Sequence, residues 1–229
     1  MAVEAKDYFI YFNIYNENSM ENCFYFSAND FRNRFRNIEN EFIVFHQNIR
    51  SFSRNGEEFL LYLNSLDVSV GVIVLSETWF TNETTQEIEG YNSFHITRNN
   101  RIGGGVSVYV RNDFNSKFLP LSSSCRDLFE VCSVHVKISN NFQLNVADIY
   151  RPPSASTYDF TNEIESFLET NWGPSVNALL CSDLNLDLSD HLSNHVSGFM
   201  QSMQSQSFLP HITIPTRVTN SSATIIDHM

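Results

Sequence analysis

The sequence is short of several features that would place a protein in or beyond a membrane. It has no run of about 18 apolar residues, which excludes a membrane-spanning helix. Its N-terminal segment has no basic stretch followed by an apolar core, which argues against a secretion signal. The four cysteines form no CxxC pair and have no histidine at ligand spacing. We interpret them as reduced thiols, three of them packed in strands, in an intracellular protein with no membrane partner.

Positive charge is scarce as well. The 229 residues include 14 Lys and Arg against 26 Asp and Glu, for a formal net charge of −12. Proteins that bind nucleic acid tightly normally carry a basic surface. Because this chain is acidic overall, we expect any binding to DNA to be weak. A metal-dependent site is compatible with this charge, because such a site needs carboxylates.

A hydrophobic content of 42% and 20 Phe residues supply the core of one substantial domain. Residues 1–40 show no periodic pattern, and we treat them as an extension ahead of a domain that spans 41–229. Their short basic patch of Arg32, Arg34 and Arg36 is interpreted as a solvated helix face rather than as a nucleic-acid-binding arm.

Strands and helices alternate from Phe42 onward. Apolar runs and strict alternation predict strands at 42–45, 68–75, 106–110, 134–138, 144–149 and 176–181. Helical spacing of apolar residues predicts helices over 56–66, over 157–168 with a cap at Ser156 or Thr157, and over 196–203. Gly103–Gly105 precede a strand and open no helix, which favours a turn or bulge over a phosphate-binding loop. The pattern favours an α/β fold with two sheets packed face to face and helices outside, in four layers.

Polar residues stand where the apolar strands end. They are Asn48, Glu77, Tyr150, Asp183 and Asn185. Each has an ordinary structural interpretation as a turn residue, a helix start, a core edge or a loop cap. A fold that brings these strand ends to one edge would instead gather them in one cleft.

The chemistry of this set is coherent. Oxygen ligands from Glu and Asn suit a hard divalent cation, above all Mg²⁺. An Asp beside an Asn can orient and deprotonate water, and a Tyr and an Arg can contact phosphate oxygens. Together the residues favour metal-assisted hydrolysis of a phosphoester.

Five sequence blocks carry a resemblance to a known family. They are His46–Ser51 (HQNIRS), Leu75–Trp79 (LSETW), Arg101–Val110 (RIGGGVSVYV), Ile149–Pro153 (IYRPP) and Ser182–Leu188 (SDLNLDL), and the segments 209–217 (LPHITIPTR) and 225–228 (IIDH) agree with them. The blocks resemble the endonuclease domain of non-LTR (LINE-type) retrotransposons, within the endonuclease/exonuclease/phosphatase superfamily that includes apurinic endonucleases. IYRPP, SETW and PTR are typical of the retrotransposon branch.

The resemblance implies a role for each matching residue. Asn48 and Glu77 would be on the metal side, with Mg²⁺ or possibly Mn²⁺ as the cofactor. Tyr150 would contact the scissile phosphate, while Asp183 would activate the attacking water and Asn185 would orient it. Asp227 would buttress a catalytic histidine, and Arg151 and Thr216 would contact substrate. The substrate would be DNA, which would place the protein in the nucleus if it acts on genomic DNA.

The sequence departs from the family pattern in two places. The family's catalytic Ser-Asp-His lies on a final strand downstream of the motif that contains Asp227, and this chain does not contain it. Ser189-Asp190-His191 is interpreted as a turn and helix start. His228 is interpreted as part of the Asp227 motif, which in the family precedes the final strand. Ser182 stands where the family has Gly, so its Cβ is expected to crowd the backbone.

From these departures we expect a fold that lacks its final strand and a DNA-nicking activity that is impaired. The chain also has no reverse-transcriptase domain, which excludes a complete retrotransposition machine. Two alternatives stay open: a non-catalytic remnant or interaction module, and a superfamily phosphatase acting on a small phosphoester.

Overall fold

The computed structural model describes residues 9–11, 23–36, 42–98, 103–172, 176–219 and 221–229. Its helices are α1 (Ala28–Phe35), α2 (Phe52–Ser65), α3 (Thr157–Asn171), α4 (Asn194–Ser205) and the 3-10 turn η2 (Pro120–Ser122). Its strands are β1 (Phe9–Tyr11), β2 (Phe24–Phe26), β3 (Ile43–Asn48), β4 (Val70–Ser76), β5 (Tyr91–Ile96), β6 (Val106–Arg111), β7 (Asn115–Phe118), β8 (Ser124–Cys125), β9 (Glu130–Lys137), β10 (Gln143–Tyr150), β11 (Ala178–Asp183), β12 (Arg217–Val218), β13 (Ala223–Thr224) and β14 (Asp227–His228).

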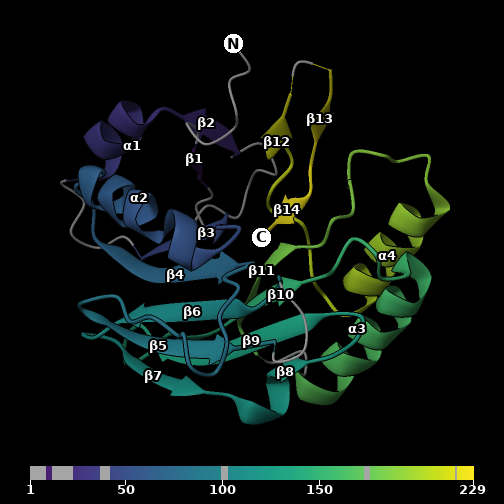
Figure 1. The fold of residues 1–229 in the computed structure, drawn as a ribbon. Coiled ribbons are helices and arrows are strands. Elements are labelled where there is room, and N and C mark those ends of the chain that lie inside the picture. Colours follow the sequence, from purple (N-terminus) through teal and green to yellow (C-terminus); the bar gives the residue numbers. More distant parts are fainter. Residues whose placement is uncertain (1–8, 12–22, 37–41, 99–102, 173–175, 220) are drawn as a thin grey trace.

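Two larger sheets form the body of the protein (Figure 1). One has the strand order β3-β4-β6-β5, and the other has the order β14-β11-β10-β9-β7, with β8 also paired to β9. The pairs β3/β4 and β10/β11 are parallel, and the remaining pairs in these sheets are antiparallel. Two short hairpin-like pairs, β1/β2 and β12/β13, lie outside them.

The sheets and helices stack in four layers (Figure 1). One apolar cluster lies between the first sheet and helices α1 and α2, a second lies between the two sheets, and a third joins the second sheet to α3 and α4. Strand β4 shows how alternation divides its side chains, because Val72 and Val74 face the other sheet while Ile73 and Leu75 face the helices. The four-layer α/β sandwich expected from the sequence is confirmed.

The predicted strands and helices are all present, with boundaries that differ by a few residues. Ser156 caps α3 as expected, since its hydroxyl accepts a hydrogen bond from the backbone N–H of Asp159 at 3.3 Å. Three cysteines were expected to pack in strands: Cys132 and Cys181 do so, whereas Cys125 lies in the short strand β8 but is exposed. None of the helices in the described ranges combines the length and hydropathy that a membrane crossing needs.

Several elements went unassigned in the sequence. Helix α1 follows β2 and buries Phe31 and Phe35 in the cluster that covers the first sheet, while its arginines stay largely in solvent. The hydroxyl of Tyr25 donates to the carbonyl oxygen of Pro215 at 2.8 Å, which ties this segment to the C-terminal region. Strands β5 and β7 were also missed, because neither shows a clear alternation of apolar and polar residues.

The glycine turn before β6 is hydrogen-bonded to the segment that follows β4. Gly103, Gly104 and Gly105 all have positive φ, between 74° and 94°. The carbonyls of Gly105 and Gly104 accept hydrogen bonds from the backbone N–H groups of Thr78 and Trp79, at 3.1 and 2.8 Å. The prediction of a turn is confirmed for these three glycines, whereas the preceding Arg101 and Ile102 of the same block lie outside the described residues.

We expect Gly105→Ala to destabilise the protein by about 1–3 kcal/mol, because φ is +84° and the new Cβ would meet the Thr78 hydroxyl at 2.8 Å. The matched control is Gly198→Ala in α4, where a Cβ meets no atom within 4 Å. That change is expected to stabilise the helix by roughly 0.5–1 kcal/mol. Urea unfolding of both variants measures the two effects, and equal stability of both variants would contradict this account of the turn.

Candidate active site

The polar residues predicted from the strand ends share one layer of the structure. Strand alternation places Asn48, Ser76, Tyr150 and Asp183 on the faces that the two sheets turn toward each other, beyond the apolar layer between them. Parallel pairing places the carboxyl ends of β3 and β4 side by side in one sheet and those of β10 and β11 side by side in the other. The hydrogen bond between Asn48 and Asp183 shows that these two sets of strand ends meet. The sequence order of these strands therefore produces one polar cluster.

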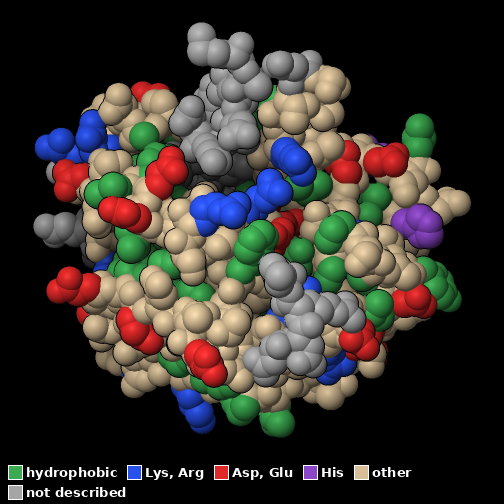
Figure 2. Space-filling view, viewed as in Figure 1, with side chains coloured by type: hydrophobic (Ala, Val, Ile, Leu, Met, Phe, Trp, Pro, Cys, Tyr) green, Lys and Arg blue, Asp and Glu red, His purple; other side chains and the backbone are tan. Residues whose placement is uncertain are grey.

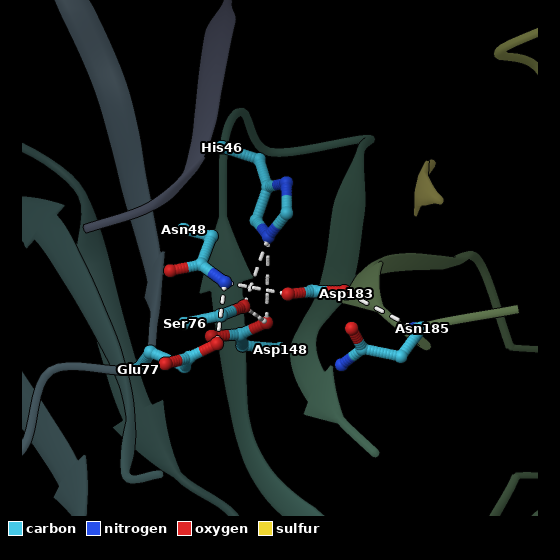
Figure 3. A network of polar contacts seen from close by, with 7 residues as sticks. All are labelled: His46, Asn48, Ser76, Glu77, Asp148, Asp183 and Asn185. Atoms are coloured by element: carbon cyan, nitrogen blue, oxygen red, sulfur yellow. Dashed lines mark hydrogen bonds and ion pairs between the residues drawn. The ribbon is translucent and has the colours of Figure 1, made fainter. Parts of the chain in front are cut away.

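The side-chain amide of Asn48 lies at the centre of this cluster (Figure 3). Its Nδ2 donates to Glu77 Oε1 at 2.8 Å and to Asp183 Oδ2 at 2.5 Å. Its Oδ1 accepts from the backbone N–H of Arg50 at 3.0 Å, which fixes which end of the amide is nitrogen. Asn48 thus joins carboxylates that come from different sheets.

Glu77 is held in an unusual backbone conformation. It has φ = 54°, and Trp79 two residues later has φ = 58°. The Glu77 carbonyl accepts from Ser51 N–H at 2.8 Å, and Trp79 Nε1 donates to the Glu77 carboxylate at 3.3 Å. Positive φ at residues other than glycine is costly and is often found at functional sites. The strain turns the Glu77 carboxylate toward Asn48 directly after β4 ends.

Asp183 and Asp227 are neighbours across the β11/β14 pair. Burial, and then the charge of Asp227, raise the pKa of Asp183 to about 6, against hydrogen bonds from Asn48 and Asn185 that lower it. Burial likewise raises the pKa of Asp227. The backbone N–H of Asn185 donates to Asp183 Oδ1 at 3.1 Å, so the loop after β11 folds back on its own carboxylate.

Tyr150 ends β10 beside these acids. Burial, followed by the charges of Glu77 and Asp183, raises its pKa well above the usual value. The phenol is therefore neutral and remains a hydrogen-bond donor. A neutral donor beside buried carboxylates suits contact with an anionic oxygen.

Arg151 and Thr216, predicted to contact substrate, support the backbone of the site. The Arg151 guanidinium donates to the carbonyls of Leu184, Ala155 and Asn185, and the residue is 3% exposed. The Thr216 hydroxyl accepts from the backbone N–H groups of Ile226 and Asp227, both at 3.1 Å. This geometry supports positioning roles, and their contact with substrate stays a prediction.

A second polar group lies next to the cluster and was missed in the sequence. Ser76 Oγ donates to Asp148 Oδ1 at 2.8 Å, and His46 Nε2 lies 3.1 Å from Ser76 Oγ and 3.7 Å from Asp148 Oδ1 (Figure 3). Burial alone would lower the pKa of His46, but the hydrogen bond and charge of Asp148 raise it above its usual value. Each of the three residues lies on an inward-facing strand position, so reading the strands at a period of two would have shown them.

A third group of polar contacts, centred on Glu130, lies beside Tyr150. Glu130 on β9 is fully buried, forms an ion pair with Arg98, and accepts a hydrogen bond from Gly105 N–H. The residue pairs with Tyr150 across β9/β10. The glycine turn of the first sheet is thereby attached to the second sheet.

The donor set at Glu77 fits a weakly held magnesium ion. In the described part of the chain, no three His, Cys, Asp or Glu side chains come together in a way that could hold a metal. Mg²⁺ needs only one or two carboxylates because it keeps several of its waters. Glu77 supplies such a carboxylate. Asn48, the other predicted ligand, turns its amide nitrogen toward the acids, and a nitrogen that donates hydrogen bonds cannot bind a cation. Of the two predicted ligands, Glu77 therefore has the better geometry.

Neither histidine considered for catalysis joins the cluster. His191 is exposed in the turn before α4, in agreement with the sequence interpretation of Ser189-Asp190-His191. His228 follows Asp227 along β14, so it faces the opposite side of the strand, where its Nε2 lies 3.2 Å from the carbonyl oxygen of Leu186. Ser182 has no positive φ and lies in regular strand conformation, so the backbone at this position does not need the conformational freedom of glycine.

Several solved structures share this fold. The endonuclease domain of TRAS1, a telomere-specific non-LTR retrotransposon, matches with a TM-score of 0.59 at 12% identity, over 82% of this chain and 84% of that domain. The AP endonuclease from Archaeoglobus fulgidus matches with a TM-score of 0.52 at 15% identity, over 73% of this chain and 70% of that one. AP endonuclease LMAP from Leishmania major matches with a TM-score of 0.53 at 14% identity, over 72% and 66%.

The chain thus has the fold of the endonuclease/exonuclease/phosphatase superfamily, and its structural neighbours include a non-LTR retrotransposon endonuclease domain. The resemblance found in the sequence is confirmed at the level of the fold. Neither a scan against protein-family profiles nor a search of curated proteins gives a match. The chemical roles of the individual residues stay predictions.

The buried imidazole of His228 is expected to make the protein acid-sensitive. Burial lowers its pKa from 6.5 to about 4, so below pH 6.5 the unfolded chain binds this proton more readily than the folded one. The stabilisation is complete above pH 6.5 and is lost as the pH falls toward 4, by about 3 kcal/mol in all. Urea unfolding from pH 7.5 to 4 should show a smaller loss in His228→Phe, while His191→Phe, at an exposed position, leaves the loss unchanged. Identical profiles for His228→Phe and the unmodified protein would disprove this explanation.

Proposed function

We propose that this domain is a metal-dependent phosphodiester hydrolase of the endonuclease type, with DNA as its substrate. The observation that carries the proposal is the hydrogen-bonded set Glu77–Asn48–Asp183, built from both sheets at one edge. The shared fold with a retrotransposon endonuclease domain and with AP endonucleases supports it.

The residues of the chain divide the chemistry among them. Asp183, whose pKa is raised to about 6, accepts a proton from the attacking water, and the Asn48 amide fixes the direction of its carboxylate. The neutral phenol of Tyr150 donates to a non-bridging phosphate oxygen. Mg²⁺ bound at Glu77 would supply Lewis-acid stabilisation of charge on the phosphate.

Binding to DNA depends on local charge, because the net charge is negative. Arg50, whose backbone contacts Asn48, and Arg217, whose charge lowers the pKa of Asp227, are both exposed next to the polar cluster. Figure 2 shows Lys and Arg side chains gathered in a short band near the middle of one face, with acidic side chains scattered around them. Such local positive charge supports weak, salt-sensitive contact with phosphates.

We expect the 229-residue chain alone to nick supercoiled plasmid at close to background rate in Mg²⁺. Within the described residues no imidazole is hydrogen-bonded to Asp227, and a missing donor of this kind costs about 10²–10³ in rate. Appending a strand with Ser-Asp-His from a related endonuclease should restore nicking. In that extended chain, Asp183→Asn should lower the rate by about 10²–10⁴.

The control is Asp190→Asn, which changes an exposed carboxylate of the neighbouring turn and should leave the rate unchanged. Full activity of the extended Asp183→Asn variant would overturn the assignment of the base. His228 lies on the opposite face of β14 from Asp227. Strong nicking by the unextended chain that disappears in His228→Ala would contradict this position, because it would show that His228 reaches the substrate.

Metal binding is expected to be weak and to depend on Glu77. Titration of Mg²⁺ followed by NMR should perturb signals of residues around Glu77, and Glu77→Gln should abolish this response because it removes the carboxylate. Glu87→Gln, at an exposed position, is the control. Undiminished binding in Glu77→Gln would assign the metal to another ligand, whatever the nicking assay shows.

A further inference from the structure

The guanidinium of Arg98 lies at the Tyr150 end of the polar cluster. Arg98 follows β5 of the first sheet, and its Nη2 forms an ion pair with Oε1 of Glu130, the fully buried acid of β9. Glu130 and Tyr150 stand directly opposite each other in the β9/β10 pair, so their side chains lie on the same face of the second sheet. The ion pair therefore brings a cation from the first sheet to the phenol that ends β10.

Close packing against the glycine turn fixes the position of this cation. A Cβ at Gly104 would lie 2.6 Å from Arg98 Cζ and 2.7 Å from Glu130 Oε1, so the ion pair occupies the space that a side chain there would need. The backbone N–H of Gly105 binds Oε2 of the same carboxylate. Because Glu130 is held in this way, the guanidinium is already oriented when no substrate is bound.

Arg98 keeps donors that its protein partners do not use. Within the described residues, its partners are the Glu130 carboxylate and the Cys125 thiol. A guanidinium has five N–H donors, and the Arg98 side chain is 14% exposed, so part of it reaches solvent. Arg151, by contrast, directs its guanidinium to three backbone carbonyls and is 3% exposed. Of these two arginines, Arg98 is the one with donors left for a ligand.

The charge of Arg98 acts on the site. Burial and the charges of Glu77 and Asp183 raise the pKa of Tyr150, and the charge of Arg98 opposes them. The guanidinium and the phenol are therefore within electrostatic range of each other. A cation beside a neutral donor suits a phosphate, because a hydrogen bond between two ionised groups is stronger than one between neutral groups.

We propose that Arg98 binds a backbone phosphate of the DNA substrate at the Tyr150 end of the site, with its guanidinium oriented by Glu130. The planar guanidinium can offer one edge to the carboxylate and another edge to phosphate oxygens. This inference rests on the proposed function, since it takes DNA as the substrate. It adds a phosphate contact from an arginine that the sequence analysis did not select.

The test is the salt dependence of DNA binding, measured by fluorescence anisotropy with a short labelled duplex in EDTA, so that Mg²⁺-dependent hydrolysis does not interfere. Each phosphate contact contributes about 0.9 to the slope of log K against the logarithm of the salt concentration. Arg98→Gln should therefore lower this slope by about 1. Arg98→Lys keeps the positive charge and should keep the slope, although it binds more weakly because it loses the planar donor set.

The matched control is Arg111→Gln. Arg111 is also paired with a carboxylate, with its Nε 2.6 Å from Asp113 Oδ1, but it ends β6, whereas the start of β6 pairs with the end of β4 beside the site. Both substitutions remove one positive charge, so a long-range effect of net charge would appear in both. A phosphate contact is lost only with Arg98.

A second variant guards against misfolding, because loss of Arg98 alone leaves Glu130 buried and unpaired. Arg98→Gln combined with Glu130→Gln keeps the net charge and removes the unpaired acid. This double variant should fold and should show the same reduced slope as Arg98→Gln.

The outcomes separate this contact from the proposed hydrolysis. Equal slopes for the unmodified chain and the folded double variant would overturn the contact, as would an equal loss of slope in Arg111→Gln. Absence of salt-dependent binding by the unmodified chain would overturn both the contact and DNA as the substrate. A slope that depends on Arg98, together with no nicking by the chain extended with Ser-Asp-His, would support the contact and overturn the hydrolysis.

Discussion

The amide of Asn48 is the contact on which the arrangement of the site depends. It donates to Glu77 of one sheet and to Asp183 of the other, so a single side chain aligns acids that would otherwise repel. The backbone N–H of Arg50 fixes the opposite end of the amide. Of the two hydrogen bonds that the nitrogen donates, the one to Asp183 crosses from the first sheet to the second, while the one to Glu77 stays within the first.

The rest of the edge is built from similar links between the sheets. Ser76 of β4 donates to Asp148 of β10, and Glu130 of β9 accepts from the N–H of Gly105 before β6. Where the apolar layer between the sheets ends, polar pairs replace it, and burial raises the pKa of both acids. Buried groups of this kind specify geometry more than they stabilise the fold.

Strand alternation explains how much of this could be predicted. The apolar strands and their polar ends were visible, and so were the residues that gather at the edge, because the signal lies in short stretches of sequence. His46 and Asp148 were not predicted, because they lie within strands and the prediction used only the polar residues at strand ends. The positioning roles of Arg151 and Thr216 could not be predicted, because these side chains bind backbone groups that are distant in the sequence.

Strands β11 and β14 present acids on one face, while their other face lines an apolar cavity between the second sheet and helices α3 and α4. This has a consequence for how the chain tolerates change. A shift of one residue in their pairing would turn Asp183 and Asp227 into an apolar space, and would bring Ser182 and His228 to the polar edge. A one-residue insertion or deletion in either strand would therefore disturb the acidic face and the cavity wall together.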